Sequence, residues 1–562
     1  MISYAIASKF NKKLTETLPV GVYAFMLAGY LLGITGHISH ITELLIIWEM
    51  LGLAVSAWII YKEKKDISLP FTDPGLAVFA VMLAVIWFVS LHMRVTNFDD
   101  FHSWAITPKN IYAIDGVPTG GMASSFYRDY FPVVMYMDYL VFKLIGSYSE
   151  SAMFAILWWL MLVMTLPFLH KERLENRLRY VCKAAMGLLV PFLMSFQFLH
   201  CLGLDIVVTM LFGSILTYLT TYDKDADIED RRFDYLRLIV SITLLGMLKT
   251  TSLIFAAVCI AVYAVKSLKP TKPRSWIECG LIPAVTLGFW ISWKVFCRIK
   301  GNTTYLSDNL NRNMQSGHRE WSYYTASTIK AFTAKLFTYG LNDGRAGLTA
   351  FCMLLVFIIA LVIYRHAYGY SIREVLSFAT VLCGMIGYLL VMMYIYLFVF
   401  EEWEALSLSS YDRYISTYFG ALLYVALFVL MINSRLPVWI PPLLVLLMLS
   451  TVNYAYVSST LLPAGYEAAY GDTIREKEEI INEFSDAVRD DPVRYGENIV
   501  IIDESEDQLR AKVLPYAAVP GVVKLIEPDD TGAMPTEEEI AETAEGFGAE
   551  RIVDLRHPAG GQ

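Results

Sequence analysis

Charged side chains are scarce in this chain of 562 residues. Asp, Glu, Lys and Arg together make up 18% of it, whereas about a quarter is usual in soluble domains. Apolar residues account for 56%. Many charge-poor stretches are long enough to cross the roughly 30 Å hydrocarbon core of a bilayer. This shortage of charge excludes an ordinary soluble protein and predicts a polytopic α-helical membrane protein.

Cysteine is also sparse, and its pattern excludes two classes of site. The seven cysteines lie in or beside apolar segments, and none occurs in the last hundred residues. No CxxC motif and no Cys/His spacing typical of a metal site is present. The sequence therefore predicts neither a disulfide framework nor a zinc site, and the cysteines are best interpreted as small buried apolar residues.

The net charge of −9 hides two unlike parts. Residues 464–562 contain 24 acidic and 9 basic side chains, a net charge of −15. The rest of the chain contains 36 basic and 30 acidic side chains, a net charge of +6. An acidic tail on a mildly basic membrane body argues against nucleic acid as a partner and leaves membrane lipids as the expected surroundings.

Apolar runs predict about thirteen transmembrane helices, at residues 17–37, 40–61, 73–95, 150–169, 180–200, 203–221, 235–248, 250–266, 276–297, 346–364, 374–400, 413–432 and 436–455. Basic loops between them predict a cytoplasmic N-terminus in the cell (plasma) membrane. The run 131–146 contains Asp138 and Lys143, so we expect a helix in the outer interface rather than a further crossing.

This topology divides the chain into three parts. They are two N-terminal transmembrane helices (1–72), a transmembrane core (73–460) with outer loops 96–149 and 298–345, and an acidic extracytoplasmic α/β domain (461–562). Within the last part, the pattern predicts a helix over 472–489, strands over 498–503, 522–526 and 551–555, and a second helix opening at Pro535.

An acidic cluster follows directly on the apolar run 76–95. Asp99, Asp100 and His102 stand there with Trp104 close behind. Carboxylates kept beside a membrane are functional candidates, and one could act as a general base while the other orients the acceptor or binds a cation. Mg²⁺ or Mn²⁺ could bind this pair, but two residues do not make a full site, so metal dependence stays open. Both carboxylates equally fit a solvated cap of an interfacial helix.

Four basic residues are candidates to hold a phosphate on the same side: Lys109, Arg128, Lys249 and Arg413. A guanidinium can grip a phosphate through two parallel hydrogen bonds. The same residues also suit simple anchors to lipid headgroups. Four further residues are candidates to bind sugar or acceptor: Trp104, Tyr130, Asp205 and Tyr411.

In their order along the chain, these motifs resemble those of the GT-C superfold of membrane glycosyltransferases, which use polyprenyl-phosphate-linked sugars. The protein O-mannosyltransferases and aminoarabinose transferases are the comparisons. Asp99-Asp100-Phe101-His102 resembles their Asp-Glu-x-His motif, and Tyr130-Phe131-Pro132 resembles their aromatic-Pro segment without its second Pro. Gly203-Leu204-Asp205 resembles the opening of a later helix, and Leu248-Lys249-Thr250-Thr251 resembles the Thr-Lys turn in altered order.

The resemblance implies an inverting, GT-C-like transferase. It would move a sugar from a polyprenyl-phosphate donor to a glycan, lipid or protein acceptor in the cell envelope. Asp99 or Asp100 would be the base, and some of Lys109, Arg128, Lys249 and Arg413 would hold the phosphate. Two alternatives stay open. One is a lipid-linked sugar flippase or transporter, which would carry charge deep within its helices. The other is a polysaccharide ligase or polymerase.

Overall fold

The computed structural model describes residues 1–64, 69–120, 128–170, 176–195, 199–222, 227–268, 271–302, 323–341, 348–369, 371–432, 435–505, 507–528 and 533–556. Half of the predicted outer loop 298–345, including residues 303–322, lies outside these described residues.

The first part of the chain forms α1 (Ile2–Phe10), α2 (Leu14–Ile34), η1 (Ile38–His40), α3 (Ile41–Glu63), η2 (Leu69–Phe71), α4 (Gly75–Ser90), η3 (Asp100–Trp104), α5 (Ile106–Ile114), α6 (Met135–Ile145), α7 (Glu150–Thr165) and η5 (Leu166–Leu169). The middle part forms α8 (Arg177–Ser195), α9 (Asp205–Thr221), α10 (Ile228–Gly246), α11 (Ser252–Ser267), α12 (Pro273–Lys300), α14 (Tyr323–Thr338), α15 (Ala350–Tyr368), α16 (Ile372–Phe398), α17 (Glu402–Ser407), α18 (Tyr411–Ile432), α19 (Ile440–Ser450) and α20 (Tyr454–Leu461). The C-terminal part forms α21 (Pro463–Ala487), β1 (Asn498–Ile502), α22 (Gln508–Ala517), β2 (Val522–Ile526), α23 (Glu537–Phe547) and β3 (Arg551–Asp554).

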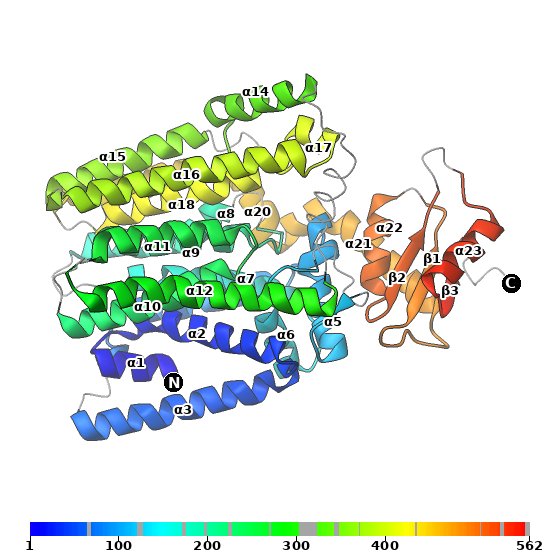
Figure 1. Cartoon of the computed structure of the whole chain (residues 1–562), viewed down its shortest axis with the longest axis horizontal. Helices are drawn as coiled ribbons and strands as arrows, with labels where there is room; N and C mark the ends of the chain where they lie inside the picture. The colour runs from blue at the N-terminus through cyan, green and yellow to red at the C-terminus, as the bar shows by residue number, and fades with distance from the viewer. Residues whose placement is uncertain are drawn as a thin grey trace.

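The protein is a multi-pass membrane protein. Among the described residues, seven helices are long and apolar enough to cross a membrane, or eight if the bent pair α19–α20 forms one span. Each of the thirteen predicted crossings coincides with a helix, but several of these helices are shorter than the apolar run that predicted them, including α4, α9 and α11. The long helices run side by side, and the C-terminal domain projects from one end of the bundle (Figure 1). We call this the domain end and the other the opposite end.

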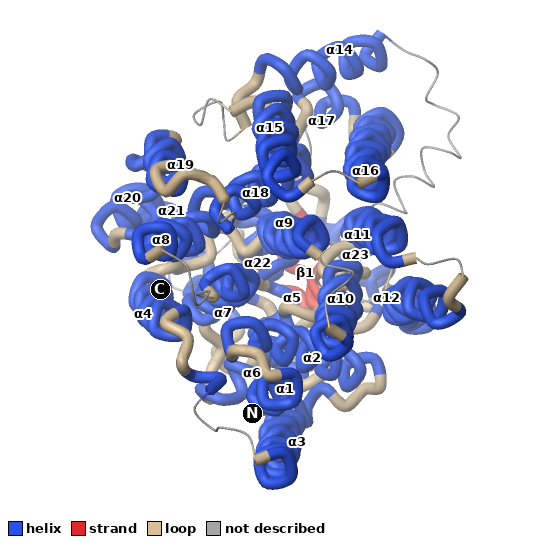
Figure 2. The backbone as a smooth tube through the Cα atoms, turned by 90° about the vertical axis from the view of Figure 1, so that its left-hand side faces the viewer, coloured by secondary structure: helices blue, strands red, loops and turns tan. Residues whose placement is uncertain are grey.

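Burial separates inner from outer helices. The apolar window of α18 is 89% buried, whereas those of α3 and α12 are each 17% buried. Viewed along the bundle, α9 and α18 are surrounded by other helices, and α3, α12 and α16 lie at its edge (Figure 2). Helices that are apolar all round fit both places, because lipid tails and a protein core are equally apolar solvents.

Two short helices lie at the ends of the bundle, one of which the sequence predicted and one of which it did not. The run 131–146 contains α6, which has 11 residues and is too short to span a membrane. It is a helix, as predicted, but most of its side chains are buried against neighbouring elements. At the N-terminus, α1 packs between α2 and α3, a helix that the sequence analysis did not predict.

The C-terminal region contains a small parallel α/β unit, as predicted. Its sheet has the order β2-β1-β3, and β1 pairs in parallel with both neighbours. Thr536 caps α23 through a capping box with Glu539, which explains why the helix starts at the acidic run after Pro535. The predicted helix 472–489 is the second half of the longer α21.

Buried polar contacts fasten this region to the domain end. The ammonium of Lys477 on α21 lies 2.8 Å from the carboxylate of Glu150, at the start of α7. Tyr516 of α22 donates to the same carboxylate at 2.7 Å, and the backbone N–H of Val95 donates to it at 2.8 Å. Tyr466 on α21 also exchanges hydrogen bonds with the backbone of Arg94. The C-terminal region therefore packs on the segment that leads to the acidic cluster.

Lys477→Met should loosen this junction. Lys477 is only 3% exposed, so removing its charge leaves Glu150 buried without its cation, at a cost of about 3–5 kcal/mol. We expect a clearly lower unfolding temperature in detergent. Arg475→Met on the same helix is the matched control, because its ion pairs are exposed and worth at most about 1 kcal/mol. Equal effects of the two substitutions would contradict the proposed junction.

Candidate active site

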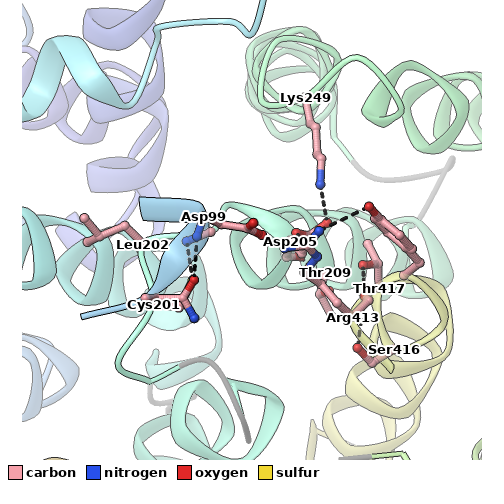
Figure 3. A network of polar contacts seen from close by, with 12 residues as sticks. Asp99, Cys201, Leu202, Asp205, Thr209, Lys249, Arg413, Ser416 and Thr417 are labelled. Carbon is pink, nitrogen blue, oxygen red and sulfur yellow. Dashed lines mark hydrogen bonds and ion pairs between the residues drawn. The ribbon is translucent and has the colours of Figure 1, made fainter. Parts of the chain in front are cut away.

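Four charged residues from four separate segments meet at the domain end. Asp205 is the first residue of α9, and Arg413 lies in the first turn of α18. Lys249 lies in the turn between α10 and α11, and Asp99 immediately precedes η3. Figure 3 shows Lys249 and Arg413 approaching Asp205 from different segments, with Asp99 on the other side. All four were singled out from the sequence, and the structure brings them together.

Acidic and basic groups alternate within this cluster. Lys249 Nζ donates to Asp205 Oδ1 at 2.8 Å. The Nε of Arg413 lies 3.6 Å from Asp205 Oδ2, and its Nη1 forms an ion pair with Asp99. Its Nη2 donates to the phenol oxygen of Tyr414 at 3.1 Å. Two carboxylates thus neutralise two cations at the ends of apolar helices, where unpaired charges would be costly.

The cluster is nevertheless incompletely hydrogen-bonded. Arg413 Nε and Asp205 Oδ2 are both buried, and neither has a hydrogen-bond partner among the described residues. The two atoms face each other at 3.6 Å, within ion-pair range but beyond hydrogen-bond distance, so both could still accommodate a further polar partner. The side chain of Asp99 is 35% exposed, compared with 15% for Arg413 and 12% for Asp205. Asp99 is therefore the carboxylate that an incoming molecule meets first.

Asp100 has a different environment from Asp99. It is fully buried, and its oxygens accept the backbone N–H of Leu202 at 3.0 and 3.1 Å. The thiol of Cys201 lies 3.4 Å away. Burial raises the pKa of Asp100 well above its ordinary value, because the charged form loses its hydration. Asp100 therefore fastens η3 to the loop before α9 and does not face Arg413.

Helix geometry explains why the two neighbours separate. Consecutive side chains on a helix point about 100° apart, so one can face the core while the other faces the cluster. The turn here is a π-helix, in which the N–H of Ala105 donates to the carbonyl of Asp100 at 2.8 Å. Because Asp99 and Asp100 are held by different groups, the pair does not form a chelating site. No group of three or more His, Cys, Asp or Glu side chains arranged for a metal occurs in the described part of the chain.

His102 and Lys109 face the C-terminal domain. The His102 ring packs on Phe98, and the Phe98 ring lies 4.7 Å from Lys512 Nζ of α22. Burial, together with the nearby Lys512 cation, lowers the pKa of His102 to about 4, so the ring is neutral at pH 7. Lys109 Nζ donates to the carbonyl of Tyr516 at 2.6 Å, and burial lowers its pKa to about 8. The structure does not bring either residue to Arg413.

The remaining predicted residues lie around the cluster at different distances. Trp104 packs on Tyr130, with ring centroids 5.2 Å apart and the ring planes tilted by 33°. A Cβ placed on Gly203 would lie 3.8 Å from Trp104 Nε1 and 3.9 Å from Asp205 Oδ2, so Trp104 borders the cluster. Arg128 and Tyr130 line a separate cavity of 20 Å³, about the size of one water. Tyr411 packs on Phe332 of α14, and Lys335 Nζ lies 5.3 Å from the centre of its ring.

One further cation was not predicted as a site residue. Lys294 of α12 forms an ion pair with Asp129, and its Nζ lies 3.5 Å from the hydroxyl of Thr250, next to Lys249. A lysine within an apolar run was the available signal. Its partner Asp129 belongs to the loop between α5 and α6, which places Lys294 near the domain end and not at the middle of the bundle.

No family model matches the chain, and no curated protein matches it. Among solved structures, it is similar to the crystal structure of ArnT from Cupriavidus metallidurans bound to undecaprenyl phosphate. The TM-score is 0.42 at 14% sequence identity, over 86% of this chain and 90% of that chain. At this identity and score the similarity assigns neither an activity nor a ligand to this chain.

Asp100→Asn should gain stability relative to wild type as the pH rises. The folded protein holds a proton on Asp100 that the unfolded chain releases above about pH 4, so this carboxyl stabilises the fold at low pH and less as the pH rises toward its raised pKa. Asparagine accepts the Leu202 N–H without titrating. Unfolding temperatures of both proteins, measured in detergent from about pH 5 to about pH 8, test this.

The matched control for that series is Asp472→Asn, whose carboxylate is 99% exposed. Its unfolding temperature relative to wild type should change little with pH. A difference between Asp100→Asn and wild type that is flat or falls with rising pH would show that Asp100 is not held protonated by its burial.

Proposed function

We propose that the protein is a membrane glycosyltransferase that moves a sugar from a polyprenyl-phosphate donor to a hydroxyl acceptor. The observation that carries the proposal is the cluster at the domain end, where an accessible carboxylate, Asp99, is held by an arginine whose Nε makes no hydrogen bond to the described residues. A base beside a phosphate-binding cation is the arrangement that this transfer needs.

In this proposal Arg413 and Lys249 receive the donor phosphate. The phosphodiester of the donor carries one negative charge, and a second develops as the bond to the sugar breaks. A guanidinium and an ammonium beside the leaving oxygen stabilise that charge. Arg413 can offer Nε to a phosphate oxygen at once, and its Nη1 becomes available when the phosphate displaces Asp99. Lys249 stays anchored by Asp205, which fixes its position.

Asp99 would then act as the general base. Once the phosphate takes over Arg413, the Asp99 carboxylate is free to accept the proton of the acceptor hydroxyl. The hydroxyl oxygen attacks the anomeric carbon, the bond from that carbon to the phosphate oxygen breaks, and the lipid phosphate leaves with the electron pair. Attack opposite the leaving group inverts the configuration. Asp100 is a positioning residue here, because it holds η3 against the loop before α9.

The surroundings of the cluster suit the other parts of such a donor. The ring of Trp104, which packs on Tyr130, borders it, and aromatic faces pack well against sugar rings. Outer helices with exposed apolar faces surround the bundle, so a polyprenyl chain can lie between helices and lipid while its phosphate reaches the ends of α9 and α18. The acceptor class, whether glycan, lipid or protein, would be selected on the side of the C-terminal domain.

Transfer from radiolabelled polyprenyl-phosphate sugars to membrane extracts tests the proposal. Asp99→Asn should lower the rate of transfer by about 10²–10⁴-fold, the contribution typical of a general base. Asp100→Asn is the matched control, because asparagine still accepts the Leu202 N–H, and its loss should be far smaller. Full activity of Asp99→Asn would contradict the base assignment. Consumption of no donor by folded wild type would favour the flippase alternative.

A further inference from the structure

A second charged site lies at the opposite end of the bundle, far from Asp99. A cavity of 320 Å³ opens there, within the range of about 300–1,000 Å³ typical of small-ligand sites. Its walls come from η5, α8, α9, α10, α15 and α18. None of the proposed transfer chemistry uses it.

The lining of this cavity is basic. Lys183, Arg237 and His170 face it, and its described lining contains no Asp or Glu. His170 is paired with Asp73, which does not line the cavity. Lys183 donates to the carbonyl of His170 at 2.7 Å. The carboxylates paired with these basic groups, Asp73 and Asp234, therefore lie outside the lining, and the wall itself presents only basic charged groups to the cavity.

Arg237 is the residue best prepared for a ligand. Its guanidinium carbon lies 3.3 Å from the centre of the Tyr218 ring, so the planar group is stacked and fixed in orientation. Its nearest carboxylate is Asp234, with Nη2 and Oδ1 4.0 Å apart, at the limit of an ion pair. Its Nε is buried and has no hydrogen-bond partner among the described residues. A preoriented guanidinium with an unused donor is suited to an oxyanion.

A neighbouring cavity offers a comparison, because a carboxylate of its own lining neutralises its cations. It has a volume of 140 Å³ and contains two cations, Lys266 and Arg365. Both pair with Glu374, which belongs to the same lining. The two cavities lie at the same end of the bundle, but only the cavity around Arg237 lacks such a carboxylate.

We propose that the cavity around Arg237 binds the phosphate of an anionic membrane lipid. Two of its wall helices, α15 and α18, are long and apolar enough to cross a membrane, and Phe168, Ile215 and Ile432 supply apolar surface for the start of an acyl chain. Tyr368 lines the cavity and is 41% exposed, so the cavity reaches the outer surface of the bundle at α15. Basic pockets between transmembrane helices are suited to lipid headgroups. A free phosphate shares the chemistry but gains nothing from the apolar wall.

Native mass spectrometry of the full chain, released from detergent with added phosphatidylglycerol, tests this. Wild type should retain phosphatidylglycerol in preference to phosphatidylcholine, and Arg237→Gln should weaken that binding at least about fivefold because the charged donor is lost. Arg274→Gln removes an exposed arginine at the same end, paired with Glu278, and should bind like wild type. Equal binding by Arg237→Gln and wild type, or equal weakening by both variants, would overturn the proposal.

Two further experiments distinguish a lipid from free phosphate and cover the case in which Arg237→Gln does not fold. Inorganic phosphate added in excess should not displace the lipid, and displacement together with phosphate binding to Arg237 would overturn the lipid assignment in favour of free phosphate. If Arg237→Gln does not fold, wild type is labelled with phosphatidylglycerol carrying a photoreactive group near its headgroup. Crosslinks should fall on the helices that line the cavity, and crosslinks confined to helices outside this lining would overturn the proposal.

Discussion

The pairing of Arg413 with Asp99 and Asp205 is the interaction on which the rest of the domain end depends. A guanidinium at the start of an apolar helix, where the helix dipole is also positive, needs compensating carboxylates. Those carboxylates come from two other segments, one before η3 and one at the start of α9. Lys249 completes the set through Asp205. One electrostatic requirement thus fixes the mutual position of four chain segments distant in sequence.

The same pairing explains how the cluster could bind an anion although its net charge is zero when no ligand is bound. Four charges cancel in the absence of a ligand, so the cluster can lie among apolar helices. An incoming phosphate can replace Asp99 at Arg413 while Asp205 keeps Lys249 in place. The C-terminal domain stabilises the arrangement from outside. Lys477 and Glu150 hold the segment before η3 through the backbone of Val95, and the hydrogen bond of Lys109 holds α5, which follows η3.

Much of this architecture could be predicted from the sequence, because hydrophobic length and alternation act locally. The apolar runs located the helices, and the strand and cap signals located the C-terminal α/β unit. The meeting of Asp99, Asp205, Lys249 and Arg413 was anticipated only through the resemblance of the motifs. The sequence did not show in which direction individual side chains point. Nothing local to Asp100 indicates that it turns into the core, and the docking of Lys109 on α22 depends on a contact made about 400 residues later in the chain.

The most direct test of the central claim is the affinity of the purified protein for polyprenyl phosphate without a sugar. The cluster predicts that Arg413→Gln weakens binding at least about tenfold, since a charged phosphate contact is lost. It predicts that Asp99→Asn binds as tightly as wild type or more tightly, because the competing carboxylate is gone. Arg128→Gln, in its separate cavity, should match wild type. Unchanged binding by Arg413→Gln, or loss of binding only in Arg128→Gln, would contradict the account.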